Sequence, residues 1–395
     1  MRKVAVFFGG KSCENEISVL TGVFVLNVLD GSKWDVLPVY IHTDGGMYTS
    51  KKAFDVEVFK KRSFAGFERV FFDGGAAYVF CGGKKVKGLG KVDAALNCCH
   101  GGLGEGGGVS ALMEMNGIPL ASPSVAASGV FMDKAMTKIV AKGLNVPTVE
   151  FLRVTERDYR RRSTFVLKAV GARLKFPVIV KPARLGSSIG IVVAENEEEL
   201  KRGIEGAFEL DDLVLVEKFL QGKKDVNCAA YSLGGEVFVS EPEEAFSGKV
   251  YGFAEKYLSG SSGGGLLSGC GGGGCVGGGG SGDGCVSAGG GRKSCRGKGI
   301  SGELRDRIRA YTKTLYKKMG LVGVVRMDFL VCGEKAYLGE VNTVPGSLAY
   351  YLFCERITDA RAFFGDLIED ALARGKEEKK IVTTGILGTV KWRRK

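Results

Sequence analysis

The sequence predicts an α/β protein whose C-terminal part is α+β. Three observations carry this prediction. Strand and amphipathic helix patterns alternate through the first third of the chain, which is typical of βαβ units around a parallel sheet. A segment near the C-terminus has the alternation and turn residues of an antiparallel hairpin. The chain has 395 residues, enough for two or three domains and a large buried core.

The first third contains five predicted elements, taken in chain order. They are a strand at 3–10, a helix at 14–30, strands at 35–43 and 91–102, and a helix at 108–117 that Gly117 closes. Ligands bind at loops that follow the carboxyl ends of parallel strands. We therefore expect binding residues in the loops at 7–16 and 98–108.

A second unit begins near residue 123 and a third near residue 213. The second contains a predicted helix at 131–143 and strands within 176–194, and the third contains a strand at 212–220, a helix at 301–320 and the hairpin at 326–347. We expect domains at 1–122, 123–212 and 213–395.

A low-complexity insertion interrupts the third unit at about 259–292, where more than half of the residues are glycine. Such a composition buries too little apolar surface to offset the entropy of ordering, so we expect disorder. Four cysteines in and beside it, Cys270, Cys275, Cys285 and Cys295, lack paired Cys-x-x-Cys spacing. We do not expect a zinc knuckle there.

The composition indicates a soluble, cytoplasmic protein, with 45% hydrophobic and 25% charged residues. No apolar run approaches the roughly 18–20 residues of a membrane span, and the N-terminus reads as a strand. The 11 cysteines are an odd number and are expected to be reduced. The net charge of +12 is spread along the chain without interleaved aromatic residues, so we expect no nucleic-acid partner.

The predicted hairpin carries acidic and amide residues on strands that are otherwise apolar. With a three-residue loop at 333–335, Asp328 lies opposite Glu340 and Arg326 opposite Asn342, all on one face. Two opposed carboxylates repel, and a Mg²⁺ ion between them would remove that cost. A two-residue loop would shift the register and separate these side chains. A solvated sheet face with scattered charges is the alternative.

Two further segments indicate anion and base binding. Lys181 ends a β-branched strand and precedes a Gly-Ser loop at 186–190, where backbone amides and a lysine suit a phosphate. The strand that ends with Glu217 offers edge backbone groups for a purine, and Glu217 could accept a hydrogen bond from the purine amino group. Asp225 could hold a ribose hydroxyl. Each segment alone is equally compatible with an ordinary turn or strand.

In this order, these motifs resemble the ATP-grasp superfamily, and more closely the D-alanine–D-alanine ligase family. The similarity also includes "FFGGKSCENEIS", "CHGGLGEGGG", "MDKAMTK", "AEKYLS" and "GEVNTVPGS". It covers nearly the whole chain apart from the glycine-rich insertion and the tail. The resemblance implies a three-subdomain ATP-grasp fold that joins two D-alanines at the expense of ATP, using two Mg²⁺ (or Mn²⁺) ions.

The resemblance also implies roles for individual residues. The implied catalytic residues are Glu14, Ser187, Tyr257, Arg326 and Gly346. The implied nucleotide-binding residues are Lys134, Lys181, Ser188, Glu217, Lys218, Phe219, Leu220, Asp225 and Lys256. His100, Ser347 and Tyr351 are the implied substrate residues, with Tyr350 as an alternative, and Asp328, Glu340 and Asn342 the metal ligands.

Two questions of function stay open at this stage. Ligases of this kind can use D-lactate or D-serine as acceptor, although Tyr257 favours D-alanine. A low-activity nucleotide-binding protein is the second alternative, because the insertion follows the "AEKYLS" segment directly. The small-molecule partners would be ATP and D-alanine, and a homodimer is usual for the family.

Overall fold

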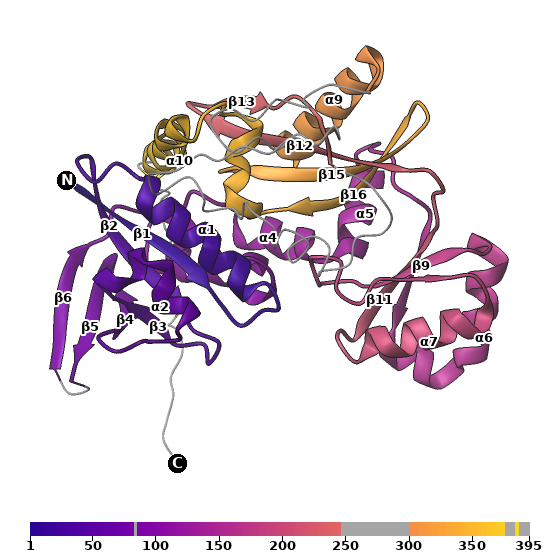
Figure 1. The fold of residues 1–395 in the computed structure, drawn as a ribbon, viewed down its shortest axis with the longest axis horizontal. Helices are drawn as coiled ribbons and strands as arrows, with labels where there is room; N and C mark the ends of the chain where they lie inside the picture. The colour runs from indigo at the N-terminus through magenta and orange to yellow at the C-terminus, as the bar shows by residue number, and fades with distance from the viewer. Residues whose placement is uncertain (83–84, 246–299, 376–383, 387–395) are drawn as a thin grey trace, which may run out of the picture.

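The structure is a computed structural model that describes residues 1–82, 85–245, 300–375 and 384–386. The glycine-rich insertion, Lys256 and Tyr257 lie outside the described residues. Three sheets form the framework, and Figure 1 shows them side by side, with the N-terminal sheet at one end and the four-stranded sheet at the other. None of the helices in the described part combines the length and apolarity needed to cross a membrane.

The N-terminal sheet has seven strands in the order β6-β5-β4-β3-β2-β1-β7. The predicted parallel core is confirmed, because β1 (Arg2–Gly9) pairs in parallel with both β2 (Trp34–Ile41) and β7 (Ala94–Asn97). An antiparallel extension that the sequence analysis did not anticipate continues beyond β2. It consists of β3 (Met47–Thr49), β4 (Glu68–Asp73), β5 (Ala76–Cys81) and β6 (Lys85–Lys91).

Helices of the N-terminal part connect these strands, and α1 and η2 begin at loops that form the site. They are α1 (Asn15–Val28), η1 (Lys51–Phe54), α2 (Val56–Lys60), the π-helical turn η2 (Gly104–Gly108) and α3 (Val109–Met115). α1 packs through its central apolar residues against β1, where Gly22 has no room for a side chain because a Cβ would lie 2.3 Å from the Phe8 ring.

The four-stranded sheet has the order β10-β9-β11-β8 and carries two helices. Its elements are β8 (Phe151–Thr155), α6 (Glu156–Leu174), β9 (Val178–Pro182), β10 (Val192–Ala194), α7 (Glu197–Phe208) and β11 (Leu213–Lys218). Leu200 and Ile204 of α7 and Val170 of α6 are fully buried against this sheet. β11 follows residue 212 in the chain, yet it pairs with β8 and β9.

The third sheet has five strands, with β13-β12-β15-β16 in a row and β14 beside β12. These are β12 (Lys224–Leu233), β13 (Glu236–Val239), β14 (Glu243–Ala245), β15 (Val325–Cys332) and β16 (Lys335–Asn342). Three helices share a core with this sheet: α4 (Val125–Met132), α5 (Lys134–Gly143) and α9 (Gly302–Lys318). Two helices, α4 and α5, occupy the region where one helix was predicted at 131–143. They are separate because Asp133 has extended backbone and caps α5 by accepting hydrogen bonds from Ala135 N and Met136 N.

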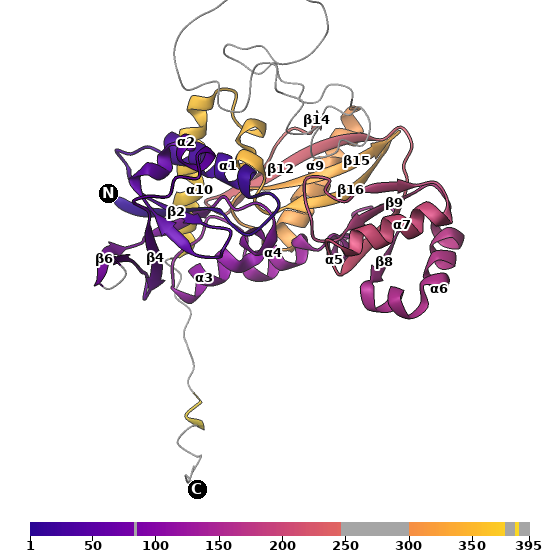
Figure 2. The same cartoon turned by 60° about the horizontal axis from the view of Figure 1, so that its bottom comes forward.

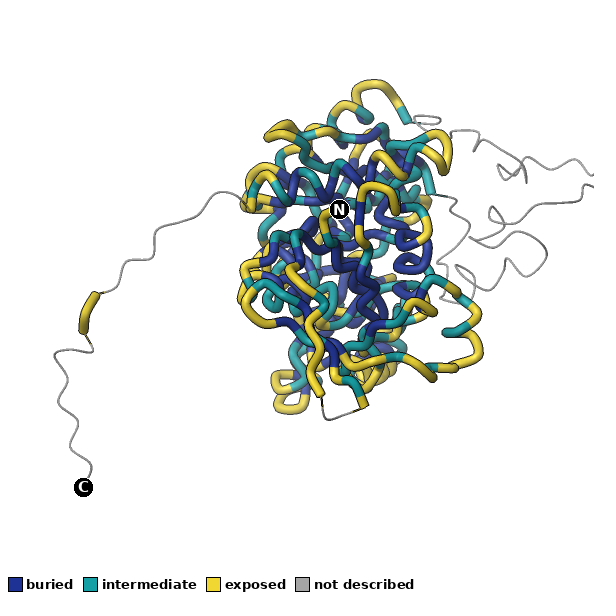
Figure 3. The backbone as a smooth tube through the Cα atoms, turned by 90° about the vertical axis from the view of Figure 1, so that its left-hand side faces the viewer, coloured by how far each residue is buried: buried dark blue, intermediate teal, exposed yellow. Residues whose placement is uncertain are grey.

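A separate core joins the N-terminal sheet to the C-terminal end of the chain. It contains residues of β1, β7 and α1 together with η3 (Gly346–Leu352) and α10 (Ala360–Arg374). The short turn η4 (Ile357–Asp359) links the last two. Figure 2 shows α1 and α10 near one another in a second view, and Figure 3 shows buried segments through the centre of the body.

The hairpin keeps the predicted residue pairs through a different local structure. β15 and β16 are joined by a two-residue turn at 333–334, so the predicted three-residue loop is wrong. That turn alone would place Asp328 opposite Gly339. A β-bulge beside Asp328 leaves Gly339 unpaired, which brings Asp328 opposite Glu340 and Arg326 opposite Asn342.

Gly339 suits this bulge because a side chain there would meet the neighbouring strand. A Cβ at Gly339 would lie 3.0 Å from the backbone oxygen of Asp328. We therefore expect Gly339→Ala to lower the free energy of unfolding by about 1–3 kcal/mol through overpacking. Urea denaturation of the ligand-free protein would measure this.

Gly206→Ala is the matched control, because Gly206 is in α7 and has open space around its Cβ position. It should raise the free energy of unfolding by about 0.4–1 kcal/mol. Equal stability of Gly339→Ala and the wild type would show that the bulge tolerates a side chain.

Candidate active site

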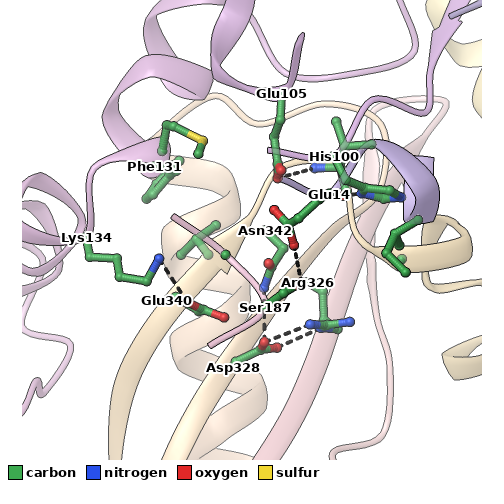
Figure 4. Close-up of a pocket in the computed structure, with 16 residues that line it drawn as sticks. Glu14, His100, Glu105, Phe131, Lys134, Ser187, Arg326, Asp328, Glu340 and Asn342 are labelled. Atoms are coloured by element: carbon green, nitrogen blue, oxygen red, sulfur yellow. Dashed lines mark hydrogen bonds and ion pairs between the residues drawn. The ribbon is translucent and has the colours of Figure 1, made fainter. Parts of the chain in front are cut away.

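A polar cleft opens where the three sheets meet. Its walls come from distant parts of the chain: the N-terminus of α1, the loop after β7, the start of α5, the β9–β10 loop and the β15–β16 hairpin. The charged and polar side chains that line it are Glu14, His100, Glu105, Lys134, Ser187, Arg326, Asp328, Glu340 and Asn342. Figure 4 shows them converging on one space.

The two opposed carboxylates of the hairpin each have a cationic partner. Arg326 donates two hydrogen bonds to Asp328, Nε to Oδ1 at 2.7 Å and Nη2 to Oδ2 at 2.8 Å. Asn342 Nδ2 donates to Asp328 Oδ2 at 3.0 Å, and Lys134 Nζ lies 3.3 Å from Glu340 Oε2. These partners offset the repulsion between the carboxylates.

Arg326 is held in its charged form by this pairing. Burial alone would lower the pKa of Arg326, but the charge of Asp328 outweighs it and raises that pKa well above the ordinary value. Arg326 Nη1 also donates to the Tyr351 hydroxyl at 3.2 Å. Arg326 is therefore a permanent cation, paired with the Asp328 carboxylate.

Hydrogen bonds connect the β9–β10 loop to the N-terminal ends of α1 and α5. Ser187 Oγ donates to Glu14 Oε1, and Lys134 Nζ donates to the backbone oxygen of Leu185 at 2.6 Å. Ser187 and Ser188 both have left-handed backbone, with φ of 52° and 58°. Such conformations cost energy for residues other than glycine and cluster at functional sites.

His100 connects the N-terminal part to the loop that follows β16. Its Nδ1 lies 2.8 Å from the backbone oxygen of Val344, and its Nε2 lies 2.8 Å from Thr21 Oγ1. Burial lowers the pKa of His100 to about 4, so the ring is neutral near pH 7. Because a carbonyl oxygen only accepts, Nδ1 carries the proton and Nε2 accepts from Thr21. Thr21 Oγ1 in turn accepts from Ser347 N at 3.2 Å.

Glu105 binds the same loop through the backbone nitrogen of Val344. Its carboxylate accepts hydrogen bonds from Gly101 N at 2.8 Å, Val344 N at 3.1 Å and Thr343 Oγ1 at 3.4 Å. Val344 is thus held at its oxygen by His100 and at its nitrogen by Glu105. Burial raises the pKa of Glu105 to about 7.

Lys181 and Glu217 form a buried pair that does not line the cleft itself. Lys181 Nζ lies 2.7 Å from Glu217 Oε2, and Lys138 Nζ lies 2.8 Å from Glu217 Oε1. The following residues extend outward: Lys218 is exposed, while Phe219 and Leu220 are half-buried. Asp225, on β12, forms an ion pair with Lys223 at 2.6 Å.

The sequence-predicted residues thus separate into three groups. Those that line the cleft are Glu14, His100, Lys134, Ser187, Arg326, Asp328, Glu340, Asn342 and Gly346. Those placed elsewhere in the described structure are Lys181, Ser188, Glu217, Lys218, Phe219, Leu220, Asp225, Ser347 and Tyr351. Lys256 and Tyr257 lie outside the described residues.

Two residues with evident structural roles here were missed by the sequence analysis. Thr21 lies on α1 and bonds both His100 and Ser347. Lys138 lies four residues after Lys134, on the buried face of α5. A lysine on the apolar face of an amphipathic helix was the available signal for Lys138; Thr21 left none, because threonine is common in buried helices.

The donor set of the hairpin has the chemistry of a hard-cation site. Carboxylate and amide oxygens of Asp328, Glu340 and Asn342 share one face of two neighbouring strands, and such oxygens suit Mg²⁺ or Mn²⁺. Among the described residues, no cluster of three or more His, Cys, Asp or Glu side chains has the arrangement of a metal site. The hairpin offers two carboxylates and one amide.

Comparisons with known proteins point to a single family. The family model "D-ala D-ala ligase N-terminus" matches residues 3–123, and "D-ala D-ala ligase C-terminus" matches residues 140–265 and 294–373. A D-alanine–D-alanine ligase of Thermosipho africanus is 31% identical over 89% of this chain and 88% of its own length. That of Wolinella succinogenes is 32% identical, with 89% of each chain covered.

Solved structures show the same fold. The D-alanine–D-alanine ligase of Helicobacter pylori has a TM-score of 0.71 at 23% identity, covering 94% of this chain and 98% of its own. A D-Ala:D-Ser ligase from Enterococcus faecalis has a TM-score of 0.67 at 22% identity, covering 95% and 99%.

We predict a pH-dependent effect of Glu105→Gln on stability. The pKa of Glu105 is about 7 when folded, against an ordinary value of 4.5. A raised carboxyl pKa adds stability below pH 4.5 that is lost as the pH rises to 7. The free energy of unfolding of the wild type minus that of Glu105→Gln should therefore fall across this range, by up to about 3 kcal/mol.

Urea denaturation of both ligand-free proteins between pH 4.5 and 8 would measure this difference. The titration of His100 is common to both proteins and largely cancels. A difference that grows with pH, or stays constant, would contradict the assignment.

Proposed function

The chain belongs to the D-alanine–D-alanine ligase family, and from this premise we propose that it joins two D-alanines to D-alanyl-D-alanine in an ATP-dependent reaction, for peptidoglycan precursors. The observation that carries the proposal is the hairpin constellation. Asp328, Glu340 and Asn342 share one face of the cleft, with Arg326 and Lys134 beside them. This arrangement has the charges needed to receive a triphosphate and a carboxylate together.

The proposed metal ligands are Asp328, Glu340 and Asn342, for two Mg²⁺ or Mn²⁺ ions. Their oxygen donors and their position on adjacent strands fit such ions. When bound, the ions would supply charge neutralisation around the phosphate oxygens. Arg326 and Lys134 now partner two of these carboxylates, so ion binding would compete with those contacts.

In the first step, the carboxylate of one D-alanine attacks the γ-phosphate of ATP and yields an acyl phosphate and ADP. Glu14 is positioned to receive the ammonium group of this D-alanine, since its carboxylate lines the cleft and is oriented by Ser187. We assign Lys134, Lys181 and the Ser188 backbone to the phosphates, and the backbone edge of residues 217–220 with Asp225 to the nucleoside.

In the second step, the amine of another D-alanine attacks the acyl carbon, and phosphate leaves. Arg326 and the backbone amide of Gly346 would donate to the developing oxyanion; such a donor typically contributes about 3–4 kcal/mol. The acceptor carboxylate would lie near Ser347 and Tyr351, and His100 orients the loop that holds them. We extend the proposal to Tyr257 and Lys256 as substrate-covering residues on family resemblance alone.

Three wider properties accompany this proposal. We propose an N-terminal domain at 1–122, supported by the family match that ends at residue 123. The central domain would begin at 123 and extend past 212 to Lys218, because β11 pairs within the central sheet. The C-terminal domain would follow. We also propose that the enzyme is cytoplasmic, acts on small molecules and forms a homodimer.

One assay tests the function and its alternatives. The full chain is incubated with ATP, Mg²⁺ and D-alanine, alone or with D-lactate or D-serine, while phosphate release and product mass are followed. Phosphate release with D-alanine alone, together with the dipeptide mass, is the expected result. A depsipeptide or D-Ala-D-Ser product would change the acceptor. Nucleotide binding without any product would indicate a silent nucleotide-binding protein.

We predict that Glu340→Gln lowers kcat at least about 100-fold while changing the ligand-free melting temperature little. Glu340 is partly exposed, and the ion pair with Lys134 at 3.3 Å is a contact of small net value. Loss of a metal-ligating carboxylate removes charge where it develops in the reaction. Steady-state kinetics over a range of Mg²⁺ concentrations would measure the effect.

Glu334→Gln in the turn of the same hairpin is the control, since Glu334 is exposed and outside the cleft. It should have the kinetics of the wild type. Unchanged turnover in Glu340→Gln would remove Glu340 from the metal site.

A further inference from the structure

Lys138 is a fully buried lysine one helical turn after the cleft residue Lys134. Residues four apart on a helix share a face, so both side chains of α5 point toward the same region. The Lys138 side chain is 0% exposed, and its Nζ lies 2.8 Å from Glu217 Oε1 and 3.4 Å from the Leu338 backbone oxygen. Lysine is rarely buried without a partner.

Glu217 connects Lys138 to Lys181. Its second oxygen, Oε2, lies 2.7 Å from Lys181 Nζ, and its own side chain is 1% exposed. Burial alone would raise the pKa of Glu217, but the charges of Lys138 and Lys181 outweigh it and lower that pKa. The carboxylate is therefore ionised, and each of its oxygens already has a cation within 3 Å.

The cluster of Lys138, Glu217 and Lys181 carries two positive charges and one negative charge. Lys181 is its most exposed member, with 12% of its side chain accessible. It is carried by β9, the strand that leads into the Ser187 loop of the cleft. Lys181 is therefore the member of the cluster through which the excess positive charge can reach a bound anion most directly.

We propose that Lys138 is a positioning residue for the nucleotide: it occupies the Glu217 carboxylate, so that Lys181 keeps a net charge for the nucleotide phosphates. Without Lys138, Glu217 would pair with Lys181 alone, and the cluster would be neutral. The inference rests on the proposed function for the identity of the anion. It differs from the sequence-based expectation that Glu217 accepts a hydrogen bond from the purine amino group.

Calorimetric titration with ADP and Mg²⁺ tests this without requiring turnover. Lys138→Met keeps the length of the side chain and removes its charge, and we expect ADP to bind about tenfold more weakly or worse. Lys142→Met is the matched control, because Lys142 is exposed on the last turn of the same helix. It should bind ADP within twofold of the wild type.

The double variant Lys138→Met/Glu217→Gln distinguishes positioning from general structural damage. It removes one charge of each sign, so the net charge of the cluster returns to that of the wild type. We expect ADP affinity within threefold of the wild type. In this variant both fully buried positions, 138 and 217, carry uncharged side chains, so it tests the proposal even if Lys138→Met fails to fold.

The outcomes separate the possibilities. Wild-type affinity in Lys138→Met, or a double variant that binds ADP at least tenfold more weakly than the wild type, would overturn the role of Lys138. Adenosine affinity should be the same in Lys138→Met and the wild type; a loss equal to that for ADP would assign Glu217 to the base. ADP binding by a wild type that forms no dipeptide would refute the ligase function alone. A wild type that does not bind ADP would refute both.

Discussion

The antiparallel pairing of Asp328 with Glu340 is the constraint on which the rest of the site depends. Directly opposed carboxylates on neighbouring strands destabilise a sheet, and this sheet keeps them because cations surround them. Arg326 holds Asp328 from within the same strand, and Lys134 reaches Glu340 from α5. The arrangement concentrates two carboxylates and two cations in one partly exposed cleft.

The N-terminal part of the chain completes the site by holding the loop after β16. His100 and Glu105 bond the two ends of the same residue, Val344, and Thr21 bonds Ser347. The apolar core that joins α1 to η3 and α10 supports these contacts over a larger area. The loop that carries Gly346 is thus fixed by residues more than 200 positions away in sequence.

Much of the fold could be predicted because local patterns and tertiary structure agree. The parallel β1, β2 and β7 strands were expected from the alternation of strand and helix patterns. The face shared by Asp328 and Glu340 was expected from strand alternation together with a three-residue loop, which the structure replaces with a shorter turn and a bulge. The helix at 131–143 was misassigned because both halves are helical, and only the extended backbone of Asp133 separates them. The antiparallel β3–β6 extension was missed because its strands are short or largely exposed and carry a weak alternation signal.

Residue types and spacing by themselves determined the order of the elements, which depends on local periodicity. They also determined the family resemblance, which depends on the identity and order of short motifs. The tertiary structure alone decided the rest. The β-bulge at Gly339 restored a register that the short turn would have shifted, since turn length and bulge compensate only once both strands are paired. The cluster of Lys138, Glu217 and Lys181 exists only where α5 packs beside β9 and β11, because its members come from three elements whose spacing in sequence carries no record of their contact.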